Sequence, residues 1–150
     1  MTTIPSKAEM TAAILQAKQR LGLKWAAIAQ AAGLSPVFVT SACLGMNSLA
    51  KAPADQLAAA LELGPEISAA LQEFPHKHWP EAIPTDPVVY RFYEMIHVYG
   101  DTIKALIHEE FGDGIMSAID FDMAISRQPD PKGDRVRIEL SGKFLPYRSW

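Results

Sequence analysis

The chain contains 150 residues, of which 49% are hydrophobic and 21% are charged, with 14 Lys+Arg against 17 Asp+Glu. This composition excludes a disordered chain, because a globular sequence of this length buries one modest core or two small ones. The formal net charge of −3 provides no long-range field that would attract nucleic acid or acidic lipid.

Residues 8–74 are predicted to be helical almost throughout, because apolar residues recur at steps of three and four, alanine is abundant and β-branched residues are sparse. Gly22 and Gly33 are expected to end the first two helices. Ser35-Pro36 is expected to start the third, with the Ser35 hydroxyl as cap and Pro36 at the first helical position. The five expected helices are one with the apolar stripe Ala13, Ile14, Ala17 and Leu21, one that begins with Trp25, Ile28 and Ala29, and three at about 36–44, 53–63 and 66–73.

The stretch from Phe74 to Pro87 contains four prolines, counting Pro87, which is the composition of an ordered connector. We place the domain boundary here, at residues 76–86. Asp86-Pro87 is predicted to begin a helix that runs to about residue 99, with Gly100 as its stop. Asp101-Thr102 is predicted to cap another helix, which runs to about residue 111.

Beyond the glycine loop Phe111-Gly-Asp-Gly114 the apolar period changes to two, which predicts strands at about 119–125 and 136–140. Pro129-Asp-Pro-Lys-Gly133 supplies turn residues between them, and the apolar tail from Gly142 to Trp150 is expected to dock on other elements. An isolated hairpin is marginal in water, so we expect another chain to complete the sheet, unless a strand lies in the connector.

The expected fold class is therefore mainly α (α+β). Residues 1–75 form a helical domain of five helices, residues 76–86 form the Pro-rich connector, and residues 87–150 form helices plus a β-hairpin that pairs with another subunit. We therefore expect an obligate homo-oligomer, unless the connector supplies the missing strand.

The segment from Trp25 to Leu63 resembles a repressor-like helix-turn-helix, with the turn at Gly33. The would-be recognition helix, Pro36 to Leu44, contains no Arg, Lys, Asn or Gln that could reach base edges. Between Leu23 and Leu63 only Lys24 and Lys51 could meet phosphate. We therefore expect no nucleic-acid partner, and interpret this domain as a scaffold or oligomerisation module.

Several other motifs are rejected on their context. Gly112-x-Gly114-x-x-Ser117 resembles a degraded dinucleotide fingerprint, but a helix precedes it and a strand follows it, which is the reverse of the required order. Asp120-x-Asp122 does not continue as a calcium loop, because Ala124, Ile125 and Pro131 stand at positions five, six and twelve. Four histidines have no metal-binding spacing and are expected to be structural or solvated, so no metal site is expected: His76, His78, His97 and His108.

Cys43 is the only cysteine, so it cannot form an internal disulfide, and we interpret it as a small buried hydrophobe. The N-terminal residues lack the apolar core of a signal peptide, and no stretch reaches the length of a membrane span. We therefore expect a cytoplasmic protein with no membrane partner.

The helix at 87–99 contains the most informative pair, since Arg91 and Glu94 are three residues apart and share a face that Met95 and Val98 flank with apolar groups. One interpretation is a surface ion pair worth a few tenths of a kcal/mol. The other is a partly desolvated interfacial pair, in which the guanidinium binds a small carboxylate-like anion and Glu94 orients it or transfers a proton. Ser117, with the backbone N–H groups of the glycine loop, could complete the anion pocket.

The residues of this central block resemble the signature of the cyanase family, also called cyanate hydratases or cyanate lyases. The resemblance covers nearly the whole chain, and it is most specific in the central block. It rests on Tyr90-Arg-Phe-Tyr-Glu-Met95, Val98-Tyr-Gly100, Ile103-Lys-Ala-Leu106, His108-Glu109 and Phe111-Gly-Asp-Gly-Ile-Met-Ser-Ala-Ile119, with the final Gly142-Lys-Phe-Leu-Pro146.

The resemblance implies decomposition of cyanate to ammonia and carbon dioxide, with bicarbonate as co-substrate, carbamate as intermediate, and no metal or organic cofactor. It implies that Arg91, Glu94 and Ser117 are catalytic and, by looser analogy, that Ala118 and Leu145 line the substrate site. It also implies a homodecamer of five dimers with sites between subunits, so that residues 87–150 are the catalytic and dimerisation domain. The competing hypothesis from another class is a repressor-like DNA-binding regulator with an oligomerising C-terminal domain.

Overall fold

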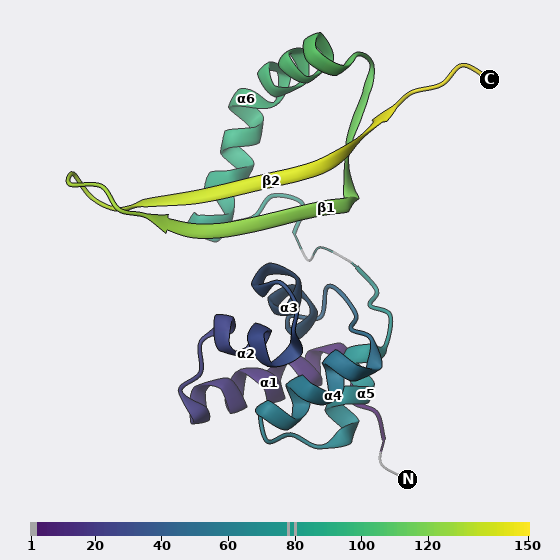
Figure 1. Ribbon diagram of the computed structural model, residues 1–150, viewed down its shortest axis with the longest axis vertical. Coiled ribbons are helices and arrows are strands. Elements are labelled where there is room, and N and C mark those ends of the chain that lie inside the picture. The colour runs from purple at the N-terminus through teal and green to yellow at the C-terminus, as the bar shows by residue number, and fades with distance from the viewer. Residues whose placement is uncertain (1–2, 78, 80) are drawn as a thin grey trace. The chain divides into compact units, whose positions relative to one another are not determined.

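The computed structural model describes residues 3–77, 79 and 81–150. The chain divides into two compact units, Met1–Lys77 and His78–Trp150, each of which is considered by itself. In chain order, helices α1 to α5 belong to the first unit, and helix α6 with strands β1 and β2 belongs to the second (Figure 1).

The described part of the first unit contains five helices, as the sequence predicts. Ser6 and Glu9 form a reciprocal capping box at the start of α1, and Gly22 (φ 63°) and Gly33 (φ 68°) end α1 and α2 in the left-handed conformation. The prediction for Ser35 is half wrong: it occupies the cap position with Pro36 behind it, but its hydroxyl makes no capping hydrogen bond. The bounds are α1 Lys7–Leu21, α2 Trp25–Ala32, α3 Pro36–Cys43, α4 Lys51–Ala60 and α5 Pro65–Gln72.

A single apolar core holds these helices together. It includes Ile14 and Ala17 of the predicted stripe on α1, while Ala13 and Leu21 pack at its edge. Cys43 is fully buried at the end of α3, as expected, and burial raises the pKa of its thiol to about 12. The largest fully buried side chains are Met10, Ile14, Ile28, Val39, Cys43, Leu57, Leu61 and Leu71.

Within the described residues, no single helix is long and apolar enough to cross a membrane, although the bent pair α2 and α3 meets the criteria of length and composition when the two are taken together. These two helices meet at 97° and contribute Ile28, Ala29, Ala32, Val39 and Ala42 to the core described above.

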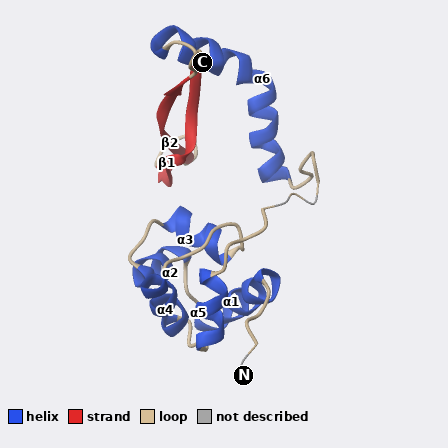
Figure 2. Ribbon diagram, turned by 90° about the vertical axis from the view of Figure 1, so that its right-hand side faces the viewer, coloured by secondary structure: helices blue, strands red, loops and turns tan. Residues whose placement is uncertain are grey.

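The second unit begins with α6, Pro87–Phe111, a single helix of 25 residues. Asp86 caps it as predicted, since its side chain accepts hydrogen bonds from the backbone N–H groups of Val88 and Val89. The prediction of two helices separated at Gly100 is wrong, because the helix continues through that residue. A glycine inside a helix costs only about 1 kcal/mol relative to alanine, so it does not by itself end a helix. Figure 2 shows that α6 is bent rather than straight.

Strands β1 (Gly114–Gln128) and β2 (Arg135–Pro146) pair antiparallel as a two-stranded sheet. Both are longer than the sequence predicts, and β1 begins at the last glycine of the expected loop. The prediction that the tail docks from Gly142 onward is confirmed as far as Tyr147, because β2 extends to Pro146 along β1 and the backbone N–H of Tyr147 donates to the carbonyl oxygen of Asp113, whereas Trp150 is fully exposed. A strand gains a hydrogen-bonded partner at each added residue, which is why the ladder extends beyond the alternating positions.

The pairing of the two strands is interrupted near the start of β1. Gly114 to Met116 pair with Pro146 to Phe144, and pairing resumes at Phe121 opposite Gly142. Residues 117–120 therefore bulge out against the single residue Lys143. Figure 1 shows the resulting sharp turn near the start of β1.

The described part of the second unit has almost no buried residues. Only Gly114 and Ser117 are buried, and no residue of α6 is. Helix α6 is apolar along one face but buries none of its residues. This face therefore lacks the partner that an apolar face requires. The large apolar residues that α6 exposes are Val88, Val89, Tyr90, Phe92, Met95, Ile96, Val98, Tyr99, Ile103, Leu106 and Phe111.

In the first unit, Asp55 links α4 to α5. Its carboxylate accepts a hydrogen bond from Lys51 Nζ at 2.8 Å and another from Ser68 Oγ at 2.5 Å. The bond from Lys51, followed by that from Ser68, holds the pKa of the Asp55 carboxyl below its ordinary value of 3.8.

We expect Asp55→Asn to lower the thermal midpoint of the full chain by a few degrees at pH 7. A depressed carboxyl pKa contributes stability above the ordinary value, and this contribution is lost as pH falls through the folded-state pKa. Melting curves followed by circular dichroism at pH 7 and pH 3 test this, because the difference between variant and wild type should shrink at pH 3. An equal difference at both pH values would contradict the role of the ionised carboxylate.

Candidate active site

Arg91 and Glu94 lie one turn apart near the start of α6, where the helical repeat places them on one face. Arg91 Nη1 donates to Glu94 Oε2 at 2.6 Å, so the structure brings the predicted pair together. The side chains remain 73% and 45% exposed in the single chain. An ion pair this open to water is worth little by itself. The arginine therefore retains most of its donors for an anion.

Ser117 is the first residue of the bulge in β1 and is only 6% exposed. Its Oγ accepts hydrogen bonds from the backbone N–H groups of Ile119 (3.1 Å) and Asp120 (3.0 Å). These bonds use the two lone pairs of the hydroxyl, so its proton is the group left to donate. Serine is suited to such a turn because its short side chain bonds to nearby backbone groups. The bulge thus holds Ser117 in one place without using its proton.

Ala118 follows Ser117 in the bulge and is exposed. Leu145 pairs with Ile115 across the sheet and is 40% exposed. Within the described residues of the second unit, no hydrogen bond or ion pair joins Arg91 or Glu94 to Ser117, Ala118 or Leu145. In the single chain the predicted site residues therefore lie in two places, on α6 and in the hairpin.

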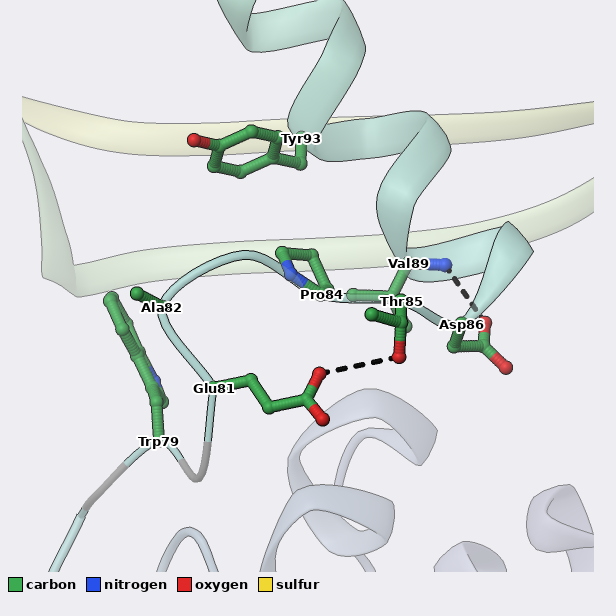
Figure 3. Close-up of a pocket in the computed structure, with 8 residues that line it drawn as sticks. All are labelled: Trp79, Glu81, Ala82, Pro84, Thr85, Asp86, Val89 and Tyr93. Carbon is green, nitrogen blue, oxygen red and sulfur yellow. Dashed lines mark hydrogen bonds between the residues drawn. The ribbon is translucent and has the colours of Figure 1, made fainter.

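A cavity of about 560 Å³ lies at the start of α6 (Figure 3). Pro84, Val89 and Tyr93 give it apolar walls, and Thr85 Oγ1 donates to Glu81 at 3.3 Å on its rim. It includes none of the predicted site residues. The rim residues Glu81 and Thr85 were not predicted as site residues, because the composition of the connector indicated only a boundary, and Tyr93 of α6 was not predicted either.

A second cavity of about 370 Å³ lies between α6 and the start of β1. Lys104, His108, Asp113 and Tyr147 are its polar residues, and His108 Nε2 lies 3.3 Å from the carbonyl oxygen of Gly114. His108 thus joins the end of α6 to the first residue of β1. The predicted site residues are not in this cavity either.

Among the described residues, no cluster of three or more His, Cys, Asp or Glu side chains is placed to hold a metal ion. His97 packs against the ring of Tyr93, with centroids 5.3 Å apart, and His108 makes the contact with Gly114 just described. His76 is exposed, and its predicted neighbour His78 lies outside the described residues.

The helix-turn-helix of the first unit consists of α2 and α3. Its surface at the turn and along α3 is apolar rather than basic, with Leu34 40%, Phe38 41% and Leu44 48% exposed. Side chains of this kind do not read base edges or bind phosphate. No contact in the described part of this unit favours the DNA-binding hypothesis.

These elements define a class of protein: a five-helix unit followed by a long helix and a two-stranded hairpin, with an arginine, a glutamate and a serine on the second unit. A solved structure of this class, the cyanase from T. urticae, is similar to the chain with a TM-score of 0.82 and 35% sequence identity, over 91% of this chain and 96% of that one.

Two family models match the chain: "Cyanate hydratase, N-terminal" over residues 7–75 and "Cyanate lyase C-terminal domain" over residues 81–149. The cyanate hydratase of Ralstonia pickettii is 56% identical over 143 residues, 95% of this chain and 97% of its own length. That of Teredinibacter turnerae is 54% identical over 144 residues, 96% of this chain and 99% of its own. The chain therefore belongs to the cyanate hydratase family, the cyanases, and is a lyase. This confirms the resemblance found in the sequence.

Proposed function

We propose that this chain decomposes cyanate with bicarbonate, giving ammonia and carbon dioxide. The observation that supports the substrate best is the match to cyanate hydratases at 54% identity over nearly the whole length of both chains. The exposed Arg91–Glu94 pair supports it chemically, because both substrates are small anions and the guanidinium donors that Glu94 leaves unused can bind them.

The proposed reaction proceeds in two stages, the formation of carbamate and its decomposition. A bicarbonate oxygen forms a bond to the cyanate carbon, and the bicarbonate proton moves to the cyanate nitrogen. The bond between the bridging oxygen and the bicarbonate carbon then breaks, which releases carbon dioxide and, with one proton, leaves carbamate. A second proton reaches the carbamate nitrogen and its C–N bond breaks, so cyanate, bicarbonate and two protons give ammonia and two carbon dioxide molecules.

Arg91 offsets the repulsion between the two anions and the double charge of the adduct. In a site with little water this electrostatic term is the largest one the protein can supply. Glu94 holds the guanidinium through the 2.6 Å bond or passes the proton that carbamate needs. The hydroxyl of Ser117 donates a hydrogen bond to the anion.

Ala118 and Leu145 line the substrate site, Ala118 beside Ser117 in the bulge and Leu145 on the facing strand. The reaction requires no metal and no organic cofactor, because addition and decarboxylation need only charge stabilisation and proton transfer.

The chain acts as a homo-oligomer, a decamer of five dimers, in which sites form between subunits. The lack of buried residues on α6 supports assembly, since another copy would cover its apolar face. Assembly would also remove water from Arg91 and bring the two parts of the site together.

We expect the purified, assembled protein to release ammonium from cyanate only when bicarbonate is present. Ammonium is measured in buffer equilibrated with bicarbonate and in buffer from which carbon dioxide has been removed by acidification and degassing. Release at the same rate in both buffers would contradict the role of bicarbonate as co-substrate. The absence of release in both would contradict the proposed function.

We expect Arg91→Lys to lower kcat by about 100-fold, because an ammonium is a point charge and cannot form the bidentate fork. Arg137→Lys is the matched control, since Arg137 forms an exposed 2.6 Å ion pair with Glu139 on β2 that the mechanism does not use. Steady-state ammonium release by the two variants checks this. Near-native turnover of Arg91→Lys would rule out bidentate anion binding by Arg91.

A further inference from the structure

Gly142 of β2 lies where the bulge of β1 folds against its partner strand. It pairs with Phe121, the residue at which regular pairing resumes. A Cβ built at Gly142 would overlap the carbonyl oxygen of Ser117, and it would lie 2.5 Å from Cγ and 3.2 Å from Sδ of Met116. Real Cβ atoms essentially never come closer than 3.0 Å to another heavy atom, so any side chain here displaces the bulge.

Gly142 faces the carbonyl oxygen of Ser117, which is one of the proposed site residues. The carbonyl oxygen is main chain, so it cannot rotate away as the end of a side chain could, and moving it moves the Cα of Ser117 as well. The hydroxyl of Ser117 is tied to the N–H groups of Ile119 and Asp120, so the bulge turns as one piece. A displacement of its backbone therefore displaces Oγ.

The same close approach occurs on the other side of the bulge. A Cβ at Gly114 would overlap the carbonyl oxygen of Leu145 and lie 2.6 Å from Cζ of Phe144. By contrast, a Cβ at Gly100 in α6 would meet only Cγ2 of Ile96, at an ordinary 3.8 Å. A Cβ would therefore overlap a backbone atom of the facing strand at both Gly114 and Gly142, whereas at Gly100 it would not.

We propose that Gly142 is a positioning residue for Ser117: because it has no side chain, the backbone at Ser117 can lie against β2, and this contact sets the position of the Ser117 hydroxyl. The inference rests on the proposed function, in which that hydroxyl donates to the anionic substrates. A hydrogen-bond donor placed about 1 Å from its productive position loses on the order of 100-fold in rate.

The test is a double-mutant cycle on the assembled protein, read as kcat and KM for bicarbonate-dependent ammonium release. We expect Gly142→Ala to lower kcat by about 10- to 100-fold in the wild-type background. In the Ser117→Ala background the same substitution should cost about twofold or less, because the group it misplaces is already gone. Gly100→Ala is the matched control and should leave kcat within about twofold, since its Cβ makes only an ordinary contact.

The assay distinguishes failure of the proposed function from failure of the inference about Gly142. An unaltered protein that does not decompose cyanate would overturn the proposed function and this inference with it. If the unaltered protein is active, an equal loss from Gly142→Ala in both backgrounds, or no loss in either, would overturn the inference alone.

Size-exclusion chromatography and circular dichroism show whether Gly142→Ala assembles. If it does not, Met116→Ala/Gly142→Ala is assayed against Met116→Ala, because this pair relieves the side-chain part of the crowding and leaves the overlap with Ser117. A lower kcat of the double variant supports the proposal. An equal kcat, or failure of the double variant to assemble, would overturn it by making Gly142 a residue required only for folding.

Discussion

An amphipathic helix that buries none of its residues is the constraint on which the rest of this structure depends. Each large apolar side chain removed from water contributes about 1.5–3 kcal/mol, and α6 exposes a continuous series of them from Val88 to Phe111. The first unit satisfies the same demand internally, with Met10, Ile14, Leu57 and Leu61 fully buried. In the proposed assembly another chain would cover this face, and folding and assembly of the second unit would then be one process.

The same constraint explains why the site looks incomplete in one chain. Arg91 and Glu94 are hydrogen-bonded but open to solvent, and among the described residues no hydrogen bond or ion pair joins them to Ser117, which is buried in the bulge. In water the pair contributes little, whereas a guanidinium moved into an interface of low dielectric binds anions strongly. In the proposed assembly, the surface buried between chains would thus also be the surface that makes the chemistry possible.

Sequence patterns predicted the elements whose signals are local. The helices of the first unit follow from apolar spacing and from Gly22 and Gly33, and the Arg91–Glu94 contact follows from their spacing of three. Features that depend on distant residues were missed or wrong. The bulge at Ser117 exists only because β2 pairs on both sides of it, and the contact with Gly142 joins residues far apart in the chain. Gly100 was wrongly expected to stop a helix, because a local glycine signal was given more weight than the helical apolar spacing on both sides of it. Ala118 and Leu145 were predicted from the family resemblance alone, because small and apolar side chains carry no reactive group that would mark them as site residues.

The most direct test of the central claim, that a working site needs residues from more than one copy, is complementation between inactive variants. Arg91→Ala and Ser117→Ala chains are co-expressed with different affinity tags, and mixed assemblies are isolated by successive purification on both tags. If sites combine Arg91 of one subunit with Ser117 of another, mixed assemblies contain some intact sites and should release ammonium well above either parent. Mixed assemblies no more active than the parents would contradict the claim and place the whole site within one chain.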